Sequence, residues 1–178
     1  QVLDDVTEFV VVGGRAFANR RGALWISQLA HFSFVEARLP AALTKGSVLG
    51  LLMSEHHYLM GVPTEAGKSV LPGPVGRLFR SDATGETWTL AVDKCHHISS
   101  NKTGAVVWRP DIHMIQGVEG AVLANKVVQF SQDQPQNIVI RTYATHDNGI
   151  HWGAVSDSKC DVGEVCNLHL GLVGWDSP

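Results

Sequence analysis

Residues 145–152 read Thr-His-Asp-Asn-Gly-Ile-His-Trp and follow the pattern (S/T)xDxGxxW without a mismatch. The short side chain of Asp147 can accept hydrogen bonds from backbone N–H groups of its own turn, and Gly149 can supply the positive φ that reverses the chain. Trp152 can then pack back onto a sheet. We therefore expect Thr145, Asp147, Gly149 and Trp152 to be structural residues of a turn between two strands, not catalytic groups.

The same pattern returns twice upstream in weaker form. Residues 81–88 differ from it only at Ala83, which stands in the aspartate position. Residues 27–34 keep the serine and an aromatic residue but have Leu29 and His31 in the aspartate and glycine positions. The retained residues of the middle copy, all expected to be structural, are Ser81, Gly85 and Trp88. The spacings of 54 residues (81 − 27) and 64 residues (145 − 81) suit one four-stranded unit per copy.

The regions between these turns favour strands. Helical periodicity is poor, and short β-rich runs bounded by Gly, Pro, Asn and Asp recur along the chain. We expect strands at residues 9–12, 23–27, 48–53, 57–62, 77–81, 87–92, 120–128, 138–145 and 151–155. We expect loops at residues 63–75, 93–114 and 129–136. The prediction is an all-β chain in which residues 1–178 form about three consecutive blades of a larger β-propeller.

Composition limits the classes of function. With 178 residues, of which 44% are hydrophobic and 17% charged, the chain can bury a core. Its formal charge of −3 provides no basic surface, so nucleic acid is not an expected partner. No apolar run approaches the roughly 20 residues needed to cross a bilayer. The chain opens on Gln1 with no signal sequence, and we expect it to be excised from a longer protein.

Two features point to the secretory lumen. Cys160 and Cys166 enclose a short polar loop in which a local disulfide is expected, which leaves Cys95 as the third cysteine. Asn101 opens an Asn-Lys-Thr sequence, which is an acceptor site for N-glycosylation. Both modifications belong to an oxidising compartment of the secretory pathway.

The turn motif is an Asp-box, which occurs in sialidases, certain glucanases and the sortilin family. The flanking residues resemble the sortilin family. Residues 116–125 are similar to the family segment in which a glycine-containing hydrophobic strand leads toward the next Asp-box. Residues 160–170 resemble its passage of a small disulfide loop followed by Asn-Leu-His-Leu. Residues 24–27 and 37–40 extend the resemblance toward the start of the chain.

This resemblance implies a fold, a location and a mode of binding. The fold is a ten-bladed propeller in the luminal part of a type I membrane receptor of the Golgi and endosomes. Its partners are cargo proteins or peptides held in the propeller tunnel, its membrane contact is a span outside this chain, and it can form homo-oligomers; no cofactor is implied. In the family, a basic residue before an Asp-box strand can hold the terminal carboxylate of a peptide. Arg20 or Arg21 is the candidate here, and we expect acidification to release cargo through some of the nine histidines.

Two other classes of function remain open for a chain with this turn motif. An Asp-box sialidase or other glycoside hydrolase needs three arginines, a tyrosine with a glutamate, and an aspartic acid; the two tyrosines, Tyr58 and Tyr143, have no convincing glutamate partner. A scaffold propeller stays open as a third class. Residues 67–69 lack the first glycine of a phosphate-binding loop. Neither His56 with His57 nor Cys95 with His96 and His97 has a second ligand pair at a recognised metal-ligand spacing, so no metal site is expected.

Overall fold

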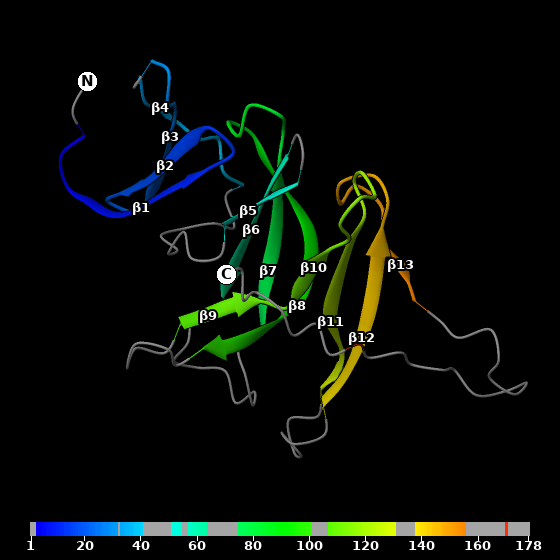
Figure 1. Cartoon of the computed structure of the whole chain (residues 1–178). Helices are drawn as coiled ribbons and strands as arrows, with labels where there is room; N and C mark the ends of the chain where they lie inside the picture. Colours follow the sequence, from blue (N-terminus) through cyan, green and yellow to red (C-terminus); the bar gives the residue numbers. More distant parts are fainter. Residues whose placement is uncertain are drawn as a thin grey trace, which may run out of the picture.

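In a computed structural model of the chain, residues 3–31, 33–40, 51–54, 57–63, 75–100, 107–130, 138–155 and 170 are described. Every regular element in these ranges is a β-strand, and all the pairings between named strands are antiparallel. Figure 1 shows the strands as successive sheets that follow one another along the sequence. The prediction of an all-β chain is confirmed.

The first sheet is a meander of four strands in the order in which they occur along the chain. The strands are β1 (Val6–Val12), β2 (Arg15–Arg20), β3 (Ala23–Gln28) and β4 (Val35–Glu36). Gly13 and Gly14 connect β1 to β2, and Arg21 and Gly22 connect β2 to β3; all four residues have a positive φ. A two-residue turn with positive φ at both positions matches the right-handed twist of the strands that it joins, so both hairpins are tight. We call this sheet the first unit.

The second sheet holds the other nine strands. They are β5 (Leu51–Ser54), β6 (His57–Pro63), β7 (Val75–Ser81), β8 (Trp88–Ser100), β9 (Val107–Pro110), β10 (Ile112–Met114), β11 (Val122–Phe130), β12 (Ile138–Thr145) and β13 (Gly153–Ala154). Strands β8 and β11 are joined only where Cys95 pairs with Lys126. We therefore distinguish a second unit, β5 to β8, from a third unit, β10 to β13. In each unit the copy of the (S/T)xDxGxxW pattern lies between the third strand and the fourth.

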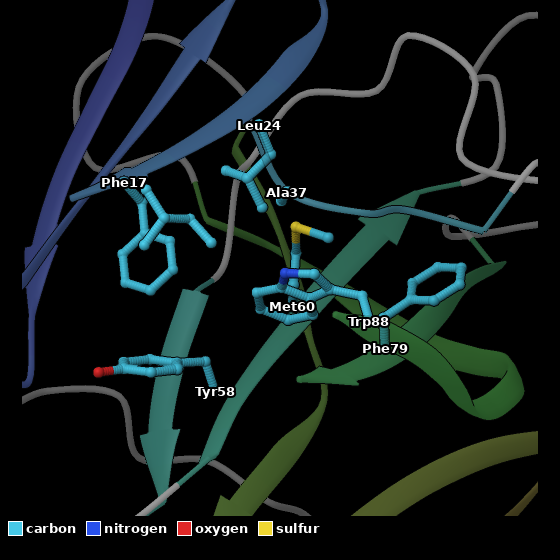
Figure 2. Close-up of a cluster of buried hydrophobic side chains, with 8 residues drawn as sticks. Phe17, Leu24, Ala37, Tyr58, Met60, Phe79 and Trp88 are labelled. Carbon is cyan, nitrogen blue, oxygen red and sulfur yellow. The ribbon is translucent and has the colours of Figure 1, made fainter. Parts of the chain in front are cut away.

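Two clusters of buried apolar side chains lie between neighbouring units. The first cluster lies between the first unit and the second and contains Phe17, Leu24, Ile26, Ala37, Tyr58, Met60, Phe79 and Trp88. Figure 2 shows the ring of Phe17 directed at that of Tyr58, with centroids 4.8 Å apart and planes at 63°. The second cluster lies between the second and third units and contains Leu59, Leu78, Val92, Cys95, Ile112, Val122 and Ala124.

The second unit is covered on both faces. Neighbouring residues of a strand point to opposite sides of a sheet. Met60 and Phe79 accordingly belong to the first cluster, whereas their neighbours Leu59 and Leu78 belong to the second. All four side chains are at most 2% exposed. This is the burial pattern of a sheet that has another sheet on each side.

The expected element boundaries need correction in several places. The described residues of the expected loop at 93–114 are mostly strand, because β8 continues to Ser100 and pairs with β9, after which β10 follows. Strand β2 was missed because its sequence, Arg-Ala-Phe-Ala-Asn-Arg, is poor in β-branched residues; its buried position in the sheet decides its conformation. The expected strand at 151–155 is reduced to β13, and β11 extends two residues past 128.

Gly76 marks a tight approach between β7 and the hairpin of β8. A Cβ atom at this position would lie 2.2 Å from Cε1 of His97 and 2.6 Å from the backbone oxygen of Val62. We expect Gly76→Ala to destabilise the fold by about 1–3 kcal/mol, because neither the ring, which is itself buried, nor the backbone can move freely. Gly153→Ala is the matched control, since nothing lies within 4 Å of its Cβ position. Urea unfolding measures both; equal stability of the two variants would contradict this packing.

Candidate functional site

The turn at residues 145–152 closes on the carboxylate of Asp147. Its Oδ1 accepts hydrogen bonds from the backbone nitrogens of Ile150 and His151, both at 2.9 Å, and from Oγ1 of Thr145 at 2.7 Å. The bonds from the His151 backbone, the Thr145 hydroxyl and the His151 ring hold the pKa of Asp147 well below its usual range. The indole Nε1 of Trp152 donates to the oxygen of Gly149 at 3.1 Å. The carboxylate is therefore committed to its own turn.

The turn at residues 81–88 keeps this construction with a displaced carboxylate. Asp82, one position before Ala83, accepts from the backbone nitrogens of Thr84 at 3.0 Å and Glu86 at 3.1 Å. Partial burial acts to raise the pKa of Asp82, but hydrogen bonds from Thr84, Thr87 and Glu86 outweigh it and lower the pKa. The indole Nε1 of Trp88 again donates to the oxygen of a turn glycine, Gly85, at 2.7 Å. The missing aspartate is thus supplied from the preceding position.

The turn at residues 27–34 retains part of the backbone arrangement. Ser27 Oγ donates to the oxygen of Gln28 at 3.1 Å, as Ser81 Oγ does to Asp82 at 2.7 Å. The backbone nitrogen of His31 donates to Gln28 at 3.1 Å, which matches the bond from Gly85 to Asp82. This copy has therefore lost its carboxylate and its glycine while keeping two of the bonds that shape the turn.

The two complete turns lie at the junctions between units. A Cβ atom on Gly85 would lie 3.4 Å from the rings of Phe17 and Tyr58, and 3.5 Å from Ile26, so this glycine packs against the first unit. In the third unit, a Cβ atom on Gly149 would lie 3.8 Å from Ala91 of β8. Each turn is thus in contact with the unit that precedes it, and its glycine leaves the room that this contact needs.

A buried polar network, which the sequence did not reveal, joins the second and third units. Asp111 Oδ2 accepts from Nδ1 of His96 at 2.9 Å and from Nδ2 of Asn125 at 2.8 Å. Asn125 Oδ1 accepts from Oγ1 of Thr142 at 2.7 Å. Asn125 and Thr142 also bind the backbone of Leu170. Its nitrogen donates to Oγ1 of Thr142 and its oxygen accepts from Nδ2 of Asn125, both at 2.9 Å. Fully satisfied networks of this kind specify one arrangement of the elements that they connect.

Two other titratable groups are buried beside this network. Burial, with a contribution from the Asp111 carboxylate, raises the pKa of the Cys95 thiol well above its ordinary value, so the thiol stays protonated. Burial lowers the pKa of His97 to about 4, and within the described ranges its Nε2 has no hydrogen-bond partner. His97 is therefore neutral near pH 7. A neutral buried histidine stabilises the fold fully above its unfolded pKa near 6.5, and this contribution is lost as the pH falls toward 4.

The two arginines expected to bind a carboxylate occupy different positions. Arg21 is at the tip of the hairpin between β2 and β3, where its exposed side chain forms an ion pair with Asp5. Arg20 is the last residue of β2; its guanidinium lies 5.4 Å from the ring centroid of Trp25, and its Nε donates to the oxygen of Asp4 at 3.1 Å. Of the two, Arg20 has no carboxylate partner in the described part of the chain. Their role in ligand binding stays a prediction.

Comparison with known proteins identifies the family. The family model described as sortilin, neurotensin receptor 3, matches residues 3–174. The chain belongs to the sortilin family. Members of this family are cargo-binding sorting receptors of the secretory and endosomal pathway, not enzymes, and the antiparallel all-β architecture agrees with a fragment of their Vps10 β-propeller. A search of curated proteins gave no significant match.

The remaining predicted sites of this sortilin-family chain lie outside the described residues. They are Asn101, Cys160 and Cys166. Among the residues that the structure describes, no three His, Cys, Asp or Glu side chains are grouped closely enough to share a metal ion. Within the same ranges, no helix is long and apolar enough to span a membrane.

The displaced carboxylate of Asp82 can be tested against its neighbour. We expect Asp82→Ala to destabilise the protein by about 1–2 kcal/mol, as the loss of a capping carboxylate does at a helix N-terminus, because the backbone N–H of Thr84 loses its acceptor and that of Glu86 keeps only the Thr84 hydroxyl. Glu86→Ala removes the same charge from the same turn, but only the backbone of Glu86 takes part in the hydrogen bonding. Thermal unfolding should separate the two variants. If Glu86→Ala were as damaging as Asp82→Ala, net charge and not the hydrogen bonds would account for the effect.

Proposed function

We propose that this chain is a cargo-binding part of the luminal propeller of a sorting receptor, which carries proteins between the Golgi and endosomal or lysosome-like compartments. The observation that carries the proposal is the family match over residues 3–174. The repeated Asp-box, placed between the third and fourth strands of each unit, supports it. On this proposal, residues 1–178 are about three consecutive blades of a ten-bladed ring.

The outer face of the first unit supports the presence of further blades. In the repeat, Trp25 stands two residues before Ser27, as Phe79 stands two residues before Ser81. Phe79 is 1% exposed because the first unit covers it. On the corresponding face of the first unit, Trp25 is only half-buried, while Phe9 and Val11 are 56% and 52% exposed. A preceding blade would cover this apolar face, as the first unit covers the second.

The side chains of the turns favour a receptor over a hydrolase. The carboxylates of Asp82 and Asp147 are hydrogen-bonded inside their turns, so neither is available as a general acid. The hydroxyl of Tyr58, a residue that a sialidase would need beside a glutamate, lies 3.4 Å from the oxygen of Gly13, and its ring is buried in the first cluster. None of these three groups therefore supports the hydrolase alternative.

The proposed mechanism is binding and release. Cargo peptides enter the tunnel of the closed ring, where Arg20 offers a guanidinium to a terminal carboxylate. The membrane anchor of this type I receptor lies outside the chain, and the receptor can act as a homo-oligomer. Acidification along the endosomal route weakens the contact. His97 supports this last step, because a pH near 5 lies within the interval in which its neutral form ceases to stabilise the fold.

Loss of the full-length protein should therefore cause missorting. We expect cells that lack it to secrete soluble luminal proteins that are normally retained, as measured by quantitative proteomics of the medium. The immobilised luminal part of the receptor should retain these same proteins at pH 7 and release most of them at pH 5. Unchanged secretion would contradict the sorting function, and retention that is equal at both pH values would remove the acid-release step alone. Cleavage of a fluorogenic sialoside would instead favour the enzyme.

The luminal location predicts two covalent modifications. Peptide mapping of the native full-length protein without reduction should find a disulfide between Cys160 and Cys166 and a glycan on Asn101. Cys95, whose buried thiol stays protonated, should be recovered as a free thiol. Free thiols at all three cysteines with an unmodified Asn101 would place the chain outside the secretory lumen and favour an intracellular scaffold.

A further inference from the structure

Two positively charged side chains lie directly opposite each other in the third unit. Lys126 of β11 pairs with Arg141 of β12, so both side chains are on one face of the sheet. The Nζ of Lys126 lies 5.6 Å from the ring centroid of Tyr143. The Nε of Arg141 is buried and has no hydrogen-bond partner among the residues that the structure describes. Like charges directly opposite destabilise a sheet, and a buried donor without an acceptor adds a desolvation cost. The pair is thus unfavourable as it stands.

The second unit shows how the same position can be neutralised within the chain. Arg77 stands four residues before Ser81, as Arg141 stands four residues before Thr145. The Nε of Arg77 lies 3.6 Å from Oδ1 of Asp93, and the residue opposite Arg77 is Val62, which is uncharged. At this position the second unit therefore has one carboxylate for one cation. The third unit has two cations and, among the described residues, no carboxylate within ion-pair distance of either.

The first unit shows which part of the arrangement is only structural. Arg20 lies 5.4 Å from the ring centroid of Trp25, as Lys126 does at 5.6 Å from that of Tyr143. The residue opposite Arg20 is Ala23, which is small and uncharged. A cation against an aromatic ring thus recurs in the repeat and needs no ligand. The second cation is particular to the third unit.

We propose that Lys126 and Arg141 bind a carboxylate of a cargo peptide, either an acidic side chain or the chain terminus. This inference rests on the proposed receptor function and specifies what the third unit recognises. A guanidinium and an ammonium on one half-buried face offer charge-assisted hydrogen bonds to such a group, and the orphan Nε–H of Arg141 becomes satisfied. The carboxylate also removes the repulsion between the two cations.

Asp157 is one alternative source of a carboxylate within the chain. It follows Trp152 by five residues, as Asp93 follows Trp88 by five, and it lies outside the described residues. One carboxylate from this position would balance Arg141, as Asp93 balances Arg77. It would still leave the charge of Lys126 in excess, because Val62 occupies the corresponding place in the second unit. An external anion would neutralise this excess charge.

The first test is the stability of the ligand-free luminal part of the full-length receptor. We expect Lys126→Met to raise the Tm by roughly 1 °C, because it relieves the repulsion from Arg141. Arg20→Met is the matched control: it removes the same kind of ring contact where no opposing cation exists, and it should leave the Tm unchanged or lower it. A fall in Tm for Lys126→Met equal to that of Arg20→Met would overturn the proposal, because Lys126 would then be a structural residue like Arg20.

The second test is peptide binding by the same protein at low salt. The probes are twelve-residue peptides of Gly, Ser and Leu, acetylated and amidated, with either three Glu or three Gln; a third peptide has Gln and a free C-terminus. We expect the carboxylate-bearing peptides to bind about tenfold more tightly than the neutral one, and Lys126→Met or Arg141→Gln to abolish this preference. Comparison of the Glu peptide with the free-terminus peptide identifies the source of the carboxylate. Arg77→Gln, whose charge has an internal partner, should keep the preference.

Three results of the binding experiment would overturn the inference. One is equal binding of neutral and carboxylate-bearing peptides, which leaves the receptor function intact as long as the wild-type protein still retains luminal proteins. Another is tighter binding of the Glu peptide to Asp157→Asn than to wild type, since Asp157 would then occupy the site. The third is displacement of the Glu peptide by inorganic phosphate at a much lower concentration than by acetate, since the site would then prefer phosphate to a carboxylate. If the receptor retains no luminal protein at all, the result contradicts the proposed receptor function itself and not only this inference.

Discussion

The hydrogen-bonded closure of the turn at residues 145–152, which returns at residues 81–88, is the constraint on which the other features depend. In both complete turns a carboxylate accepts backbone N–H groups, and the following tryptophan returns its indole N–H to the oxygen of the turn glycine. This closure fixes the reversal between the third and fourth strands. It also brings the tryptophan and the glycine to the junction with the preceding unit, where Trp88 is almost fully buried. The turn is therefore both a hairpin and part of the interface between sheets.

The two junctions between units use different chemistry. The first is apolar, with the Phe17 and Tyr58 rings in edge contact (Figure 2). Both rings lie close to Gly85. The second adds a buried network centred on Asp111 and Asn125 to its apolar cluster. Apolar packing tolerates small shifts, whereas a buried network loses several hydrogen bonds when one partner moves. The second and third units are thus held in a more narrowly specified arrangement, and they form a rigid frame for the charged face of β11 and β12.

Repetition within one chain separates structural residues from candidate binding residues. The cation that lies against an aromatic ring occurs in the first and third units, so it belongs to the architecture. The arginine four residues before the turn occurs in the second and third units, but only Arg77 has a carboxylate partner among the described residues. A residue type that recurs with the same contacts is explained by the fold. A residue that recurs without its partner points to a ligand or to another part of the protein.

The sequence by itself determined the class of the fold, because a turn that combines a backbone-accepting carboxylate, a glycine with positive φ and a returning tryptophan is a local structure encoded in eight consecutive residues. It also predicted most strands, whose apolar and β-branched residues are read locally. Only the tertiary structure decided that Asp82 replaces the carboxylate missing at Ala83, that residues 93–100 continue β8, and that Asp111, Asn125 and Thr142 meet. These outcomes depend on strand register and on contacts between residues far apart in the chain, such as the pairing of Lys126 with Arg141, which no local pattern encodes.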